Sequence, residues 1–219
     1  CDWALREKGC LERALQLKAK GFARHVGFST HGPLPLIQRA IRDGRFEYVN
    51  LHYYWAFQDN LPAIREAAAR DMGILIISPN DKGGRLYEPP EKLRQLTMPL
   101  SPMVYNDLFC LAHPEIHTLS IGNRLASDFD EHLRAVELLS QHPLDVRSLV
   151  APIEARLWAE YERVLGHDFA LTWREGLPTW KQAPGHINVR EILRLYNLAR
   201  VYDLVAHGRD RYGLFENGD

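Results

Sequence analysis

Short hydrophobic runs alternate with amphipathic segments over the first two thirds of the chain. The runs centre near Gly27, Leu51, Ile76 and Leu119, and each has the length of a β-strand. Segments with apolar residues three or four positions apart predict helices over 9–20, 34–43, 61–70, 102–112 and 128–140. The strand centres are 24, 25 and 43 residues apart, which fits repeated strand–helix units with one insertion. This alternation predicts an α/β fold with a parallel sheet and right-handed crossovers.

Polar or small residues follow the predicted strands. The first strand runs through Val26 and Phe28 into Ser29 and Thr30, and the other three cover 48–53, 73–77 and 117–121. The run over 73–77 is apolar throughout, as in a strand buried on both faces. Parallel α/β proteins bind their ligands at the carboxyl ends of the strands, so we expect the functional residues there.

The remaining segments predict loops and a helical end. Residues 78–84 are a polar loop, and four prolines between positions 89 and 102 indicate a longer irregular excursion. From about residue 146 the pattern is helical, with helices over 149–165 and 188–207 and a Gly/Pro/Trp-rich stretch over 173–186. We therefore predict a strand–helix part over 1–145 and an α-helical C-terminal extension over 146–219.

Two architectures accommodate four strand–helix units. One is an open α/β sheet, complete in itself, and the other is the second half of an eight-stranded barrel. An amphipathic helix over 9–20 precedes the first predicted strand and would belong to an earlier unit of a barrel. This helix favours the half-barrel.

Composition restricts the classes of function. The chain is 46% hydrophobic and 25% charged, and its formal net charge of −1 gives no electrostatic basis for binding nucleic acid or an anionic membrane. Neither a bilayer-spanning apolar run nor a signal peptide is apparent. Cys1, Cys10 and Cys110 have no motif spacing, which predicts reduced thiols in a cytoplasmic protein. Because the sequence begins at Cys1 without Met, we expect an N-terminal portion to precede it.

Three segments together resemble a known family. The segments 27–32 (GFSTHG), 78–87 (SPNDKGGRLY) and 119–122 (LSIG) resemble strands five, seven and eight of aldo-keto reductases, in the same order and with fitting spacing. The chain looks most like the bacterial subfamily with a ferredoxin-type tail. The resemblance implies the C-terminal half of a (β/α)8 TIM barrel, strands five to eight, followed by a helical extension. It also implies an oxidoreductase that transfers hydride between a nicotinamide cofactor, NAD or NADP, and a carbonyl or alcohol substrate.

The resemblance implies a cofactor role for residues at the strand ends. The strand-five pair and the strand-six amide would bind the nicotinamide carboxamide, and the loop after strand seven would wrap the pyrophosphate. Residues after strand eight would lie at the adenosine phosphate and the adenine. From the nicotinamide to the adenine, the matching residues are Ser29, Thr30, Asn50, Ser78, Asn80, Lys82, Gly83, Gly122, Asn123, Arg124, Glu131 and His132.

The chain departs from the family at three places. Ile77 replaces the aromatic residue that often stacks on the nicotinamide. Asp128 stands where members that prefer NADPH carry Arg, and a carboxylate there would repel a 2′-phosphate, so we expect a slight preference for NAD. The family's catalytic Asp, Tyr, Lys and His come from the first four strand–helix units. We therefore assign no catalytic residue, Tyr53, Tyr54 and Lys82 included, and expect no turnover from this segment alone.

The extension retains the spacing of a ferredoxin-type motif without its thiolates. Where relatives carry Cys-x2-Cys-x2-Cys-x3-Cys-Pro, this chain has Trp173, Gly176, Thr179 and Ala183 followed by Pro. We expect no iron–sulfur cluster.

Alternative functions remain open at this point. The lost cysteines and Ile77 fit a catalytically inactive barrel remnant that serves as a binding or scaffold module. An open-sheet nucleotide-binding domain, complete in itself, is a third class. We do not expect a metal site at His113 and His117, because Pro114 breaks the helix that would place them on one face.

Overall fold

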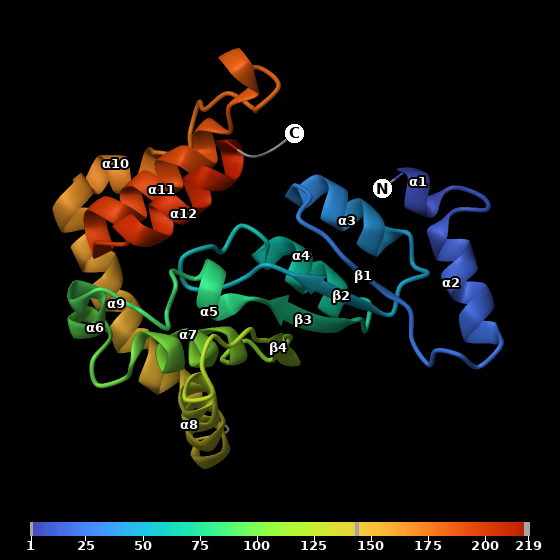
Figure 1. The fold of residues 1–219 in the computed structure, drawn as a ribbon, viewed down its shortest axis with the longest axis horizontal. Helices are drawn as coiled ribbons and strands as arrows, with labels where there is room; N and C mark the ends of the chain where they lie inside the picture. The colour runs from blue at the N-terminus through green and yellow to red at the C-terminus, as the bar shows by residue number, and fades with distance from the viewer. Residues whose placement is uncertain (1, 143–144, 217–219) are drawn as a thin grey trace. The chain divides into compact units, whose positions relative to one another are not determined.

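Four strands form one parallel sheet in the computed structural model, which describes residues 2–142 and 145–216 (Figure 1). The strand order follows the chain, β1-β2-β3-β4, and every neighbouring pair is parallel. The strands are β1 (Gly27–Ser29), β2 (Tyr48–Leu51), β3 (Gly73–Ile77) and β4 (Thr118–Ser120). The predicted α/β fold with a parallel sheet is confirmed.

Helices precede, connect and follow the strands. Those up to β4 are α1 (Asp2–Leu5), α2 (Cys10–Ala19), α3 (Leu34–Arg42), α4 (Leu61–Ala68), α5 (Pro79–Lys82), α6 (Glu91–Thr97) and α7 (Pro102–Leu111). Those after it are α8 (Asp128–Gln141), α9 (Val146–Leu165), α10 (His167–Thr172), α11 (Val189–Tyr202) and α12 (Val205–Glu216), with a 3₁₀ turn at Pro184–His186.

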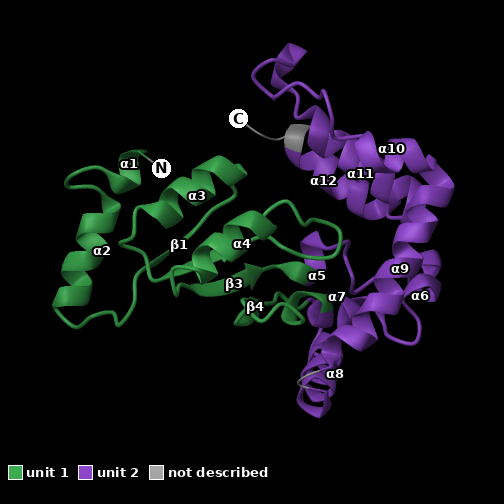
Figure 2. Ribbon diagram, turned by 180° about the vertical axis from the view of Figure 1, so that it is seen from behind, with its two compact units in different colours: residues 1–79, 109–123 green, residues 80–108, 124–219 purple. Residues whose placement is uncertain are grey.

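The chain divides into two compact units, which Figure 2 shows in different colours. Unit 1 comprises residues 1–79 and 109–123 and contains the sheet with α1 to α4. Unit 2 comprises residues 80–108 and 124–219 and contains α6, α8, α9, α10, α11 and α12. The division predicted at residue 145/146 separates a strand–helix part from a helical extension, and it stays a prediction.

One face of the sheet in unit 1 is buried. Val49 and Leu51 of β2 and Ile74 and Ile76 of β3 are completely buried on that face. Helix α4 packs on β3 and against α3, and both helices direct their own apolar residues inward. The apolar stripes of these two helices therefore account for the covered face.

The opposite face of the sheet is only partly covered. Tyr48, Asn50, Leu75 and Ile77 are half-buried there, and Ser29 at the end of β1 is exposed. The alternation along β3 corrects the expectation of a strand buried on both faces. The consecutive strand order explains this one-sidedness, because right-handed crossovers that all advance in one direction put their helices on one face.

A close contact fixes the alignment of the first three strands. Gly27, Tyr48 and Gly73 lie side by side in the registers of β1, β2 and β3. A Cβ atom built on Gly27 would lie 2.4 Å from the Tyr48 ring, and one on Gly73 would lie 3.1 Å from the Tyr48 Cβ. The two glycines therefore leave room for the aromatic side chain between them.

Short helices occupy segments that the sequence indicated as irregular. The expected loop over 78–84 contains α5, which begins at Pro79, and proline is favourable at the first helical position. The expected irregular excursion contains α6, whose Leu93 is fully buried. The prolines at these positions stand at the starts of the two helices, and interpreting them as loop residues caused the helices to be missed.

The C-terminal helices also differ from expectation. The single helix expected over 188–207 is two helices, because Asp203 adopts a left-handed conformation with φ of 59° and ends α11. Helix α9 begins at Val146, three residues before its predicted start, and α10 was not predicted. Gly166, with φ of 85°, separates α9 from α10.

Two further expectations concern cysteines and membranes. Cys10 is exposed and Cys110 is buried, and neither of the two forms a disulfide bond, whereas Cys1 lies outside the described residues. Over the described part of the chain, no helix is both long and apolar enough to cross a membrane.

Substitution of Gly27 by Ala tests the packing under Tyr48. The added methyl group would displace the aromatic ring, so we expect Gly27→Ala to lower the free energy of unfolding by about 1–3 kcal/mol in chemical denaturation. Gly122→Ala is the matched control, because no atom lies within 4 Å of a Cβ built there. Equal stability of the two variants would contradict this packing.

Candidate functional site

The carboxyl ends of β1 and β2 bring two predicted cofactor residues together in unit 1. Ser29 lies directly beside Asn50 in the register of the two strands. Asn50 belongs to the partly covered face, since it alternates with the buried Val49 and Leu51, and Ser29 shares this face because it is in register with Asn50. The parallel sheet thus forms a polar edge where the sequence predicted one.

Two amide side chains of unit 1 have unused hydrogen-bonding atoms. The Oδ1 atom of Asn50 is buried and has no hydrogen-bond partner among the described residues. At Asn123, three residues beyond β4, both amide atoms are buried without such a partner. A ligand that donates to Asn50 would satisfy an acceptor that the folded chain leaves free.

Backbone turns occupy the two other predicted positions at the strand ends. Thr30 Oγ1 accepts the Gly32 N–H at 2.9 Å, so this hydroxyl caps the turn after β1 while its own proton stays available. Ser78 follows β3 with φ of 52°, and its N–H donates to the Ser120 carbonyl at 2.8 Å. The left-handed residue turns the chain away from the sheet at this point.

A cluster of aromatic rings beyond β1 and β2 was not predicted from the sequence. The imidazole rings of His31 and His52 lie 4.6 Å apart between centroids, and the Tyr54 ring lies 6.1 Å from His52. These residues follow the polar strand ends directly. A single polar residue after a strand carries little signal, and only the parallel register of the two strands brings them together.

Tyr53, His113 and His117 make structural contacts within unit 1. Tyr53 is 1% exposed, and its hydroxyl lies 2.8 Å from Nε2 of His113. His117 Nδ1 accepts the backbone N–H of Ile74 at 3.1 Å. In residues 2–142 and 145–216, no three His, Cys, Asp or Glu side chains group as metal ligands would.

In unit 2, the segment predicted to wrap a pyrophosphate is a tight loop. Asn80 and Gly83 are buried, and the Leu86 N–H donates to the Asn80 carbonyl at 2.8 Å. The Tyr87 hydroxyl donates to Asp81 Oδ1 at 3.0 Å. Burial lowers the pKa of the Lys82 ammonium group, and the nearby positive charge of Arg211 lowers it further. An anion beside Lys82 would oppose both effects.

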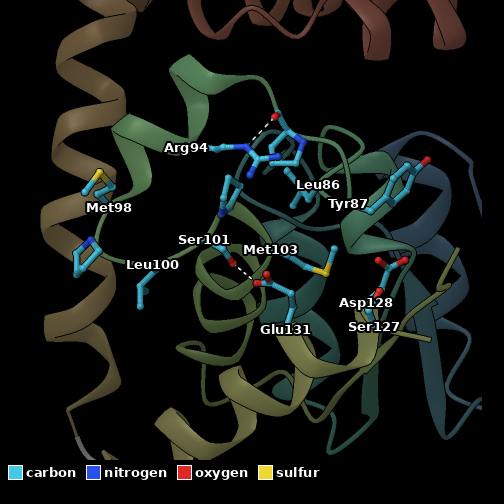
Figure 3. Close-up of a pocket in the computed structure, with 13 residues that line it drawn as sticks. Leu86, Tyr87, Arg94, Met98, Leu100, Ser101, Met103, Ser127, Asp128 and Glu131 are labelled. Carbon is cyan, nitrogen blue, oxygen red and sulfur yellow. Dashed lines mark hydrogen bonds between the residues drawn. The ribbon is translucent and has the colours of Figure 1, made fainter. Parts of the chain in front are cut away.

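A cavity of about 450 Å³ lies beside this loop within unit 2 (Figure 3). Leu86 and Tyr87 come from the loop, and Ser127, Asp128 and Glu131 come from the start of α8. Further lining residues, from α6 to the start of α7, include Arg94, Met98, Leu100, Ser101 and Met103. The cavity therefore combines apolar and aromatic surface with two carboxylates and one guanidinium group.

Hydrogen bonds fix the carboxylates of the cavity. Asp128 accepts the backbone N–H groups of Leu125 and Arg124, both at 2.9 Å, and these bonds hold the pKa of its carboxyl below its ordinary range. The Glu131 carboxylate accepts a hydrogen bond from the Ser101 hydroxyl. The Arg124 guanidinium lies 4.8 Å above the Tyr87 ring. Ser127 stands before α8 without a side-chain cap hydrogen bond, and the Asp128 carboxylate binds the preceding turn.

His132 is an interior residue of unit 2. It is 7% exposed, and its Nδ1 lies 2.5 Å from Oδ2 of Asp107, which is 2% exposed. Burial raises the pKa of the Asp107 carboxyl, although the His132 ring opposes this shift. The match of His132 to an adenine-binding residue stays a prediction, and the observed contact is a structural one between α8 and α7.

Comparison with known proteins finds a similar solved structure and no similar family model or curated protein. No protein family model matches the chain, and no curated protein matches it. Among solved structures, the chain is similar to the holo form of the aldo-keto reductase AKR11C1 from Bacillus halodurans, with a TM-score of 0.51 and 16% identity. The fold is aldo-keto reductase-like. The similarity covers 64% of this chain and 55% of that chain, so the chain spans about half the length of that reductase.

The four tail residues that the sequence analysis matched to cluster cysteines have packing and turn roles. Trp173 and Ala183 are buried at 5% exposure each. Thr179 donates its hydroxyl to Gln182 at 2.8 Å, and Gly176 adopts φ of 68°. The expectation that no iron–sulfur cluster binds here stays a prediction.

A buried histidine of α12 provides a test of the interior of unit 2. His207 is 1% exposed, and burial lowers its pKa from 6.5 to about 4. Arg194 and Arg211 lower the pKa further, while Asp81 and Asp210 oppose them.

The unfolded chain therefore binds a proton more readily than the folded chain does. The stability contribution of neutral His207 is complete above pH 6.5 and is lost as the pH falls towards 4. We expect a loss of about 3 kcal/mol over this range, measured by urea unfolding.

His207→Leu should remove this dependence on pH, whereas a leucine at the exposed His142 should leave it in place. An unchanged dependence in His207→Leu would contradict the assignment.

Proposed function

We propose that this chain is the cofactor-binding half of an aldo-keto reductase-like oxidoreductase, in which hydride passes between a nicotinamide cofactor and a small carbonyl or alcohol substrate. The observation that carries the proposal is the register of Ser29 with Asn50 at the carboxyl edge of the sheet, on its partly covered face. The aldo-keto reductase-like fold supports the same function.

We infer that the sheet of unit 1 is one half of a (β/α)8 barrel. Strand order β1-β2-β3-β4, with only one face fully buried, fits a barrel wall whose inner face is completed by four further strands. A doubly wound open sheet has helices on both faces and would bury both. The edges of β1 and β4 are the places where a barrel would continue. The helices from α9 onward then form the C-terminal extension.

The residues at the edge of the sheet suit a nicotinamide carboxamide. The free Oδ1 acceptor of Asn50 fits the carboxamide NH2 group, and the exposed hydroxyl of Ser29 fits its carbonyl oxygen. Thr30 keeps a hydroxyl proton for the same purpose, because only its oxygen is used in the turn. Ser78, Gly122 and Asn123 belong to the same set of strand ends.

The role of these residues is to bind and orient the cofactor. When bound, the nicotinamide ring supplies or accepts the hydride. Two hydrogen-bonding groups on adjacent strands would fix the plane of the carboxamide and therefore select the ring face that meets the substrate. We assign the proton-transfer role to no residue of this chain.

The cavity of unit 2 would, taken by itself, suit an adenosine group. Leu86 and Tyr87 offer apolar and aromatic surface to a purine, and Glu131 also lines the cavity. The Arg124 guanidinium lies over the Tyr87 ring. Asp128 and Glu131 bring negative charge to the cavity, which disfavours a 2′-phosphate. The cavity therefore supports NAD over NADP.

Calorimetric titration of this chain with NADH and NADPH tests the proposal. We expect NADH to bind at millimolar concentrations or below and NADPH to bind more weakly. Asn50→Leu should weaken NADH binding about tenfold without loss of thermal stability, because Oδ1 has no partner to lose. Thr118→Val, an exposed substitution on the same face of β4, is the control and should bind like the wild type. Failure of both nucleotides to bind, or equal effects of the two substitutions, would contradict the proposal.

A further inference from the structure

Helices α11 and α12 of unit 2 lie side by side and form a groove of about 380 Å³ between them (Figure 1). The buried Leu195 and Gly208 line it where the two helices meet, since a Cβ built on Gly208 would lie 3.9 Å from the Leu195 carbonyl oxygen. A groove of this volume lies within the range of small-molecule sites in proteins.

Apolar and aromatic side chains make up most of the surface of this groove. Tyr196, Val205 and Tyr212 line it, and each is about half exposed, so their apolar surface is in contact with water. Removing such surface from water is favourable. On α12 the lining residues extend from Val205 to Gly213, about 12 Å at the rise of an α-helix. The groove is therefore elongated, which suits an unbranched apolar chain.

The charge at the groove is positive. Arg209 lines it and is exposed, and its guanidinium has no hydrogen bond or ion pair with any described residue. A second guanidinium, that of Arg200, donates to the hydroxyl of the lining residue Tyr196 at 3.0 Å. Among the described residues that line the groove there is no carboxylate. An anion would therefore find an available partner here.

The carboxylates next to the lining residues in the sequence are already paired. Glu191 accepts a hydrogen bond from Nε of Arg194 at 2.9 Å, and Asp210 forms an ion pair with Arg85. Asp203, between the two helices, is not one of the lining residues. These carboxylates therefore leave Arg209 available for a negatively charged ligand.

We propose that the groove between α11 and α12 binds an amphipathic anion, namely a carboxylate on an unbranched apolar chain. The chain covers the apolar surface at Leu195 and Tyr212, and the carboxylate pairs with Arg209. A guanidinium group binds the two oxygens of a carboxylate in parallel, and the methylene groups of an arginine can lie along an apolar chain. The inference uses none of the residues proposed to bind the cofactor, so it does not rest on the proposed function.

Calorimetric titration with sodium decanoate, below the concentration at which it forms micelles, tests the proposal. We expect decanoate to bind and decyltrimethylammonium, with the same chain and the opposite charge, to bind at least tenfold more weakly. Arg209→Gln should weaken decanoate binding about tenfold, because it removes the charged partner of the carboxylate. No binding of decanoate, or wild-type affinity in Arg209→Gln, would overturn the proposal.

Two further variants separate the groove from a general effect of charge. Arg24→Gln removes an exposed arginine of unit 1 with the same change of net charge, and it should bind decanoate like the wild type. Gly208→Leu places a side chain in the groove and should abolish binding. Leucine is a better helix former than glycine, so we expect no loss of thermal stability in this variant. Wild-type affinity in a folded Gly208→Leu variant would contradict a site in the groove.

Hydrogen exchange and light scattering distinguish the ligand from other occupants of the groove. Decanoate should slow exchange in peptides from α11 and α12 and leave peptides from α8 unchanged. Protection confined to α8 would place decanoate elsewhere and overturn the proposal. A dimer of the chain that Gly208→Leu dissociates would show that a second copy covers the groove, and this result would also overturn it.

Discussion

The parallel register of β1, β2 and β3 is the constraint on which the candidate site depends. Side chains alternate along a strand, so a slip of one residue would turn Asn50 into the buried face and expose Val49 and Leu51. The Tyr48 ring is a second obstacle to such a slip, because only a residue without a Cβ fits beside the ring on β1. Hydrophobic burial on one face thus determines which polar groups meet on the other.

The two faces of the sheet have different consequences for function. The covered face supplies stability through fully buried aliphatic side chains packed under helices. The other face has half-buried residues and the Asn50 amide oxygen, which has no hydrogen-bond partner among the described residues. A buried polar atom without a partner lowers the stability of a fully packed core. These features fit the barrel wall and the cofactor site at its polar edge that we propose.

The sequence predicted the regular parts of the fold well, for reasons of periodicity. All four strands and the helices α2, α3, α4, α7 and α8 lie within a few residues of their predicted bounds. Helices α5 and α6 were missed because Pro79 and Pro90 were interpreted as breakers, although each stands at a helix start. The end of α11 was missed because a left-handed Asp203 leaves no mark on an apolar pattern.

The sequence predicted the candidate site less completely. The alternation of strands and helices predicted that functional residues lie at the strand ends, and the family resemblance implied which residues these are. The structure places Ser29 beside Asn50. Contacts between residues far apart in the chain had no local signal. The pairs His132 with Asp107 and Arg211 with Asp81 are separated by 25 and 130 residues. Such pairs depend on how helices pack, which periodicity does not determine.

The most direct test of the nicotinamide site is hydrogen-exchange mass spectrometry of the chain with and without NADH. We predict slower exchange with NADH in the peptides that contain the strand ends, residues 27–32, 48–52 and 118–123, and in the loop over 78–87. Peptides from α2 and from α9 should exchange at the same rate in both states. Protection confined to helices away from the strand ends, or none at saturating NADH, would contradict a nicotinamide site at this edge of the sheet.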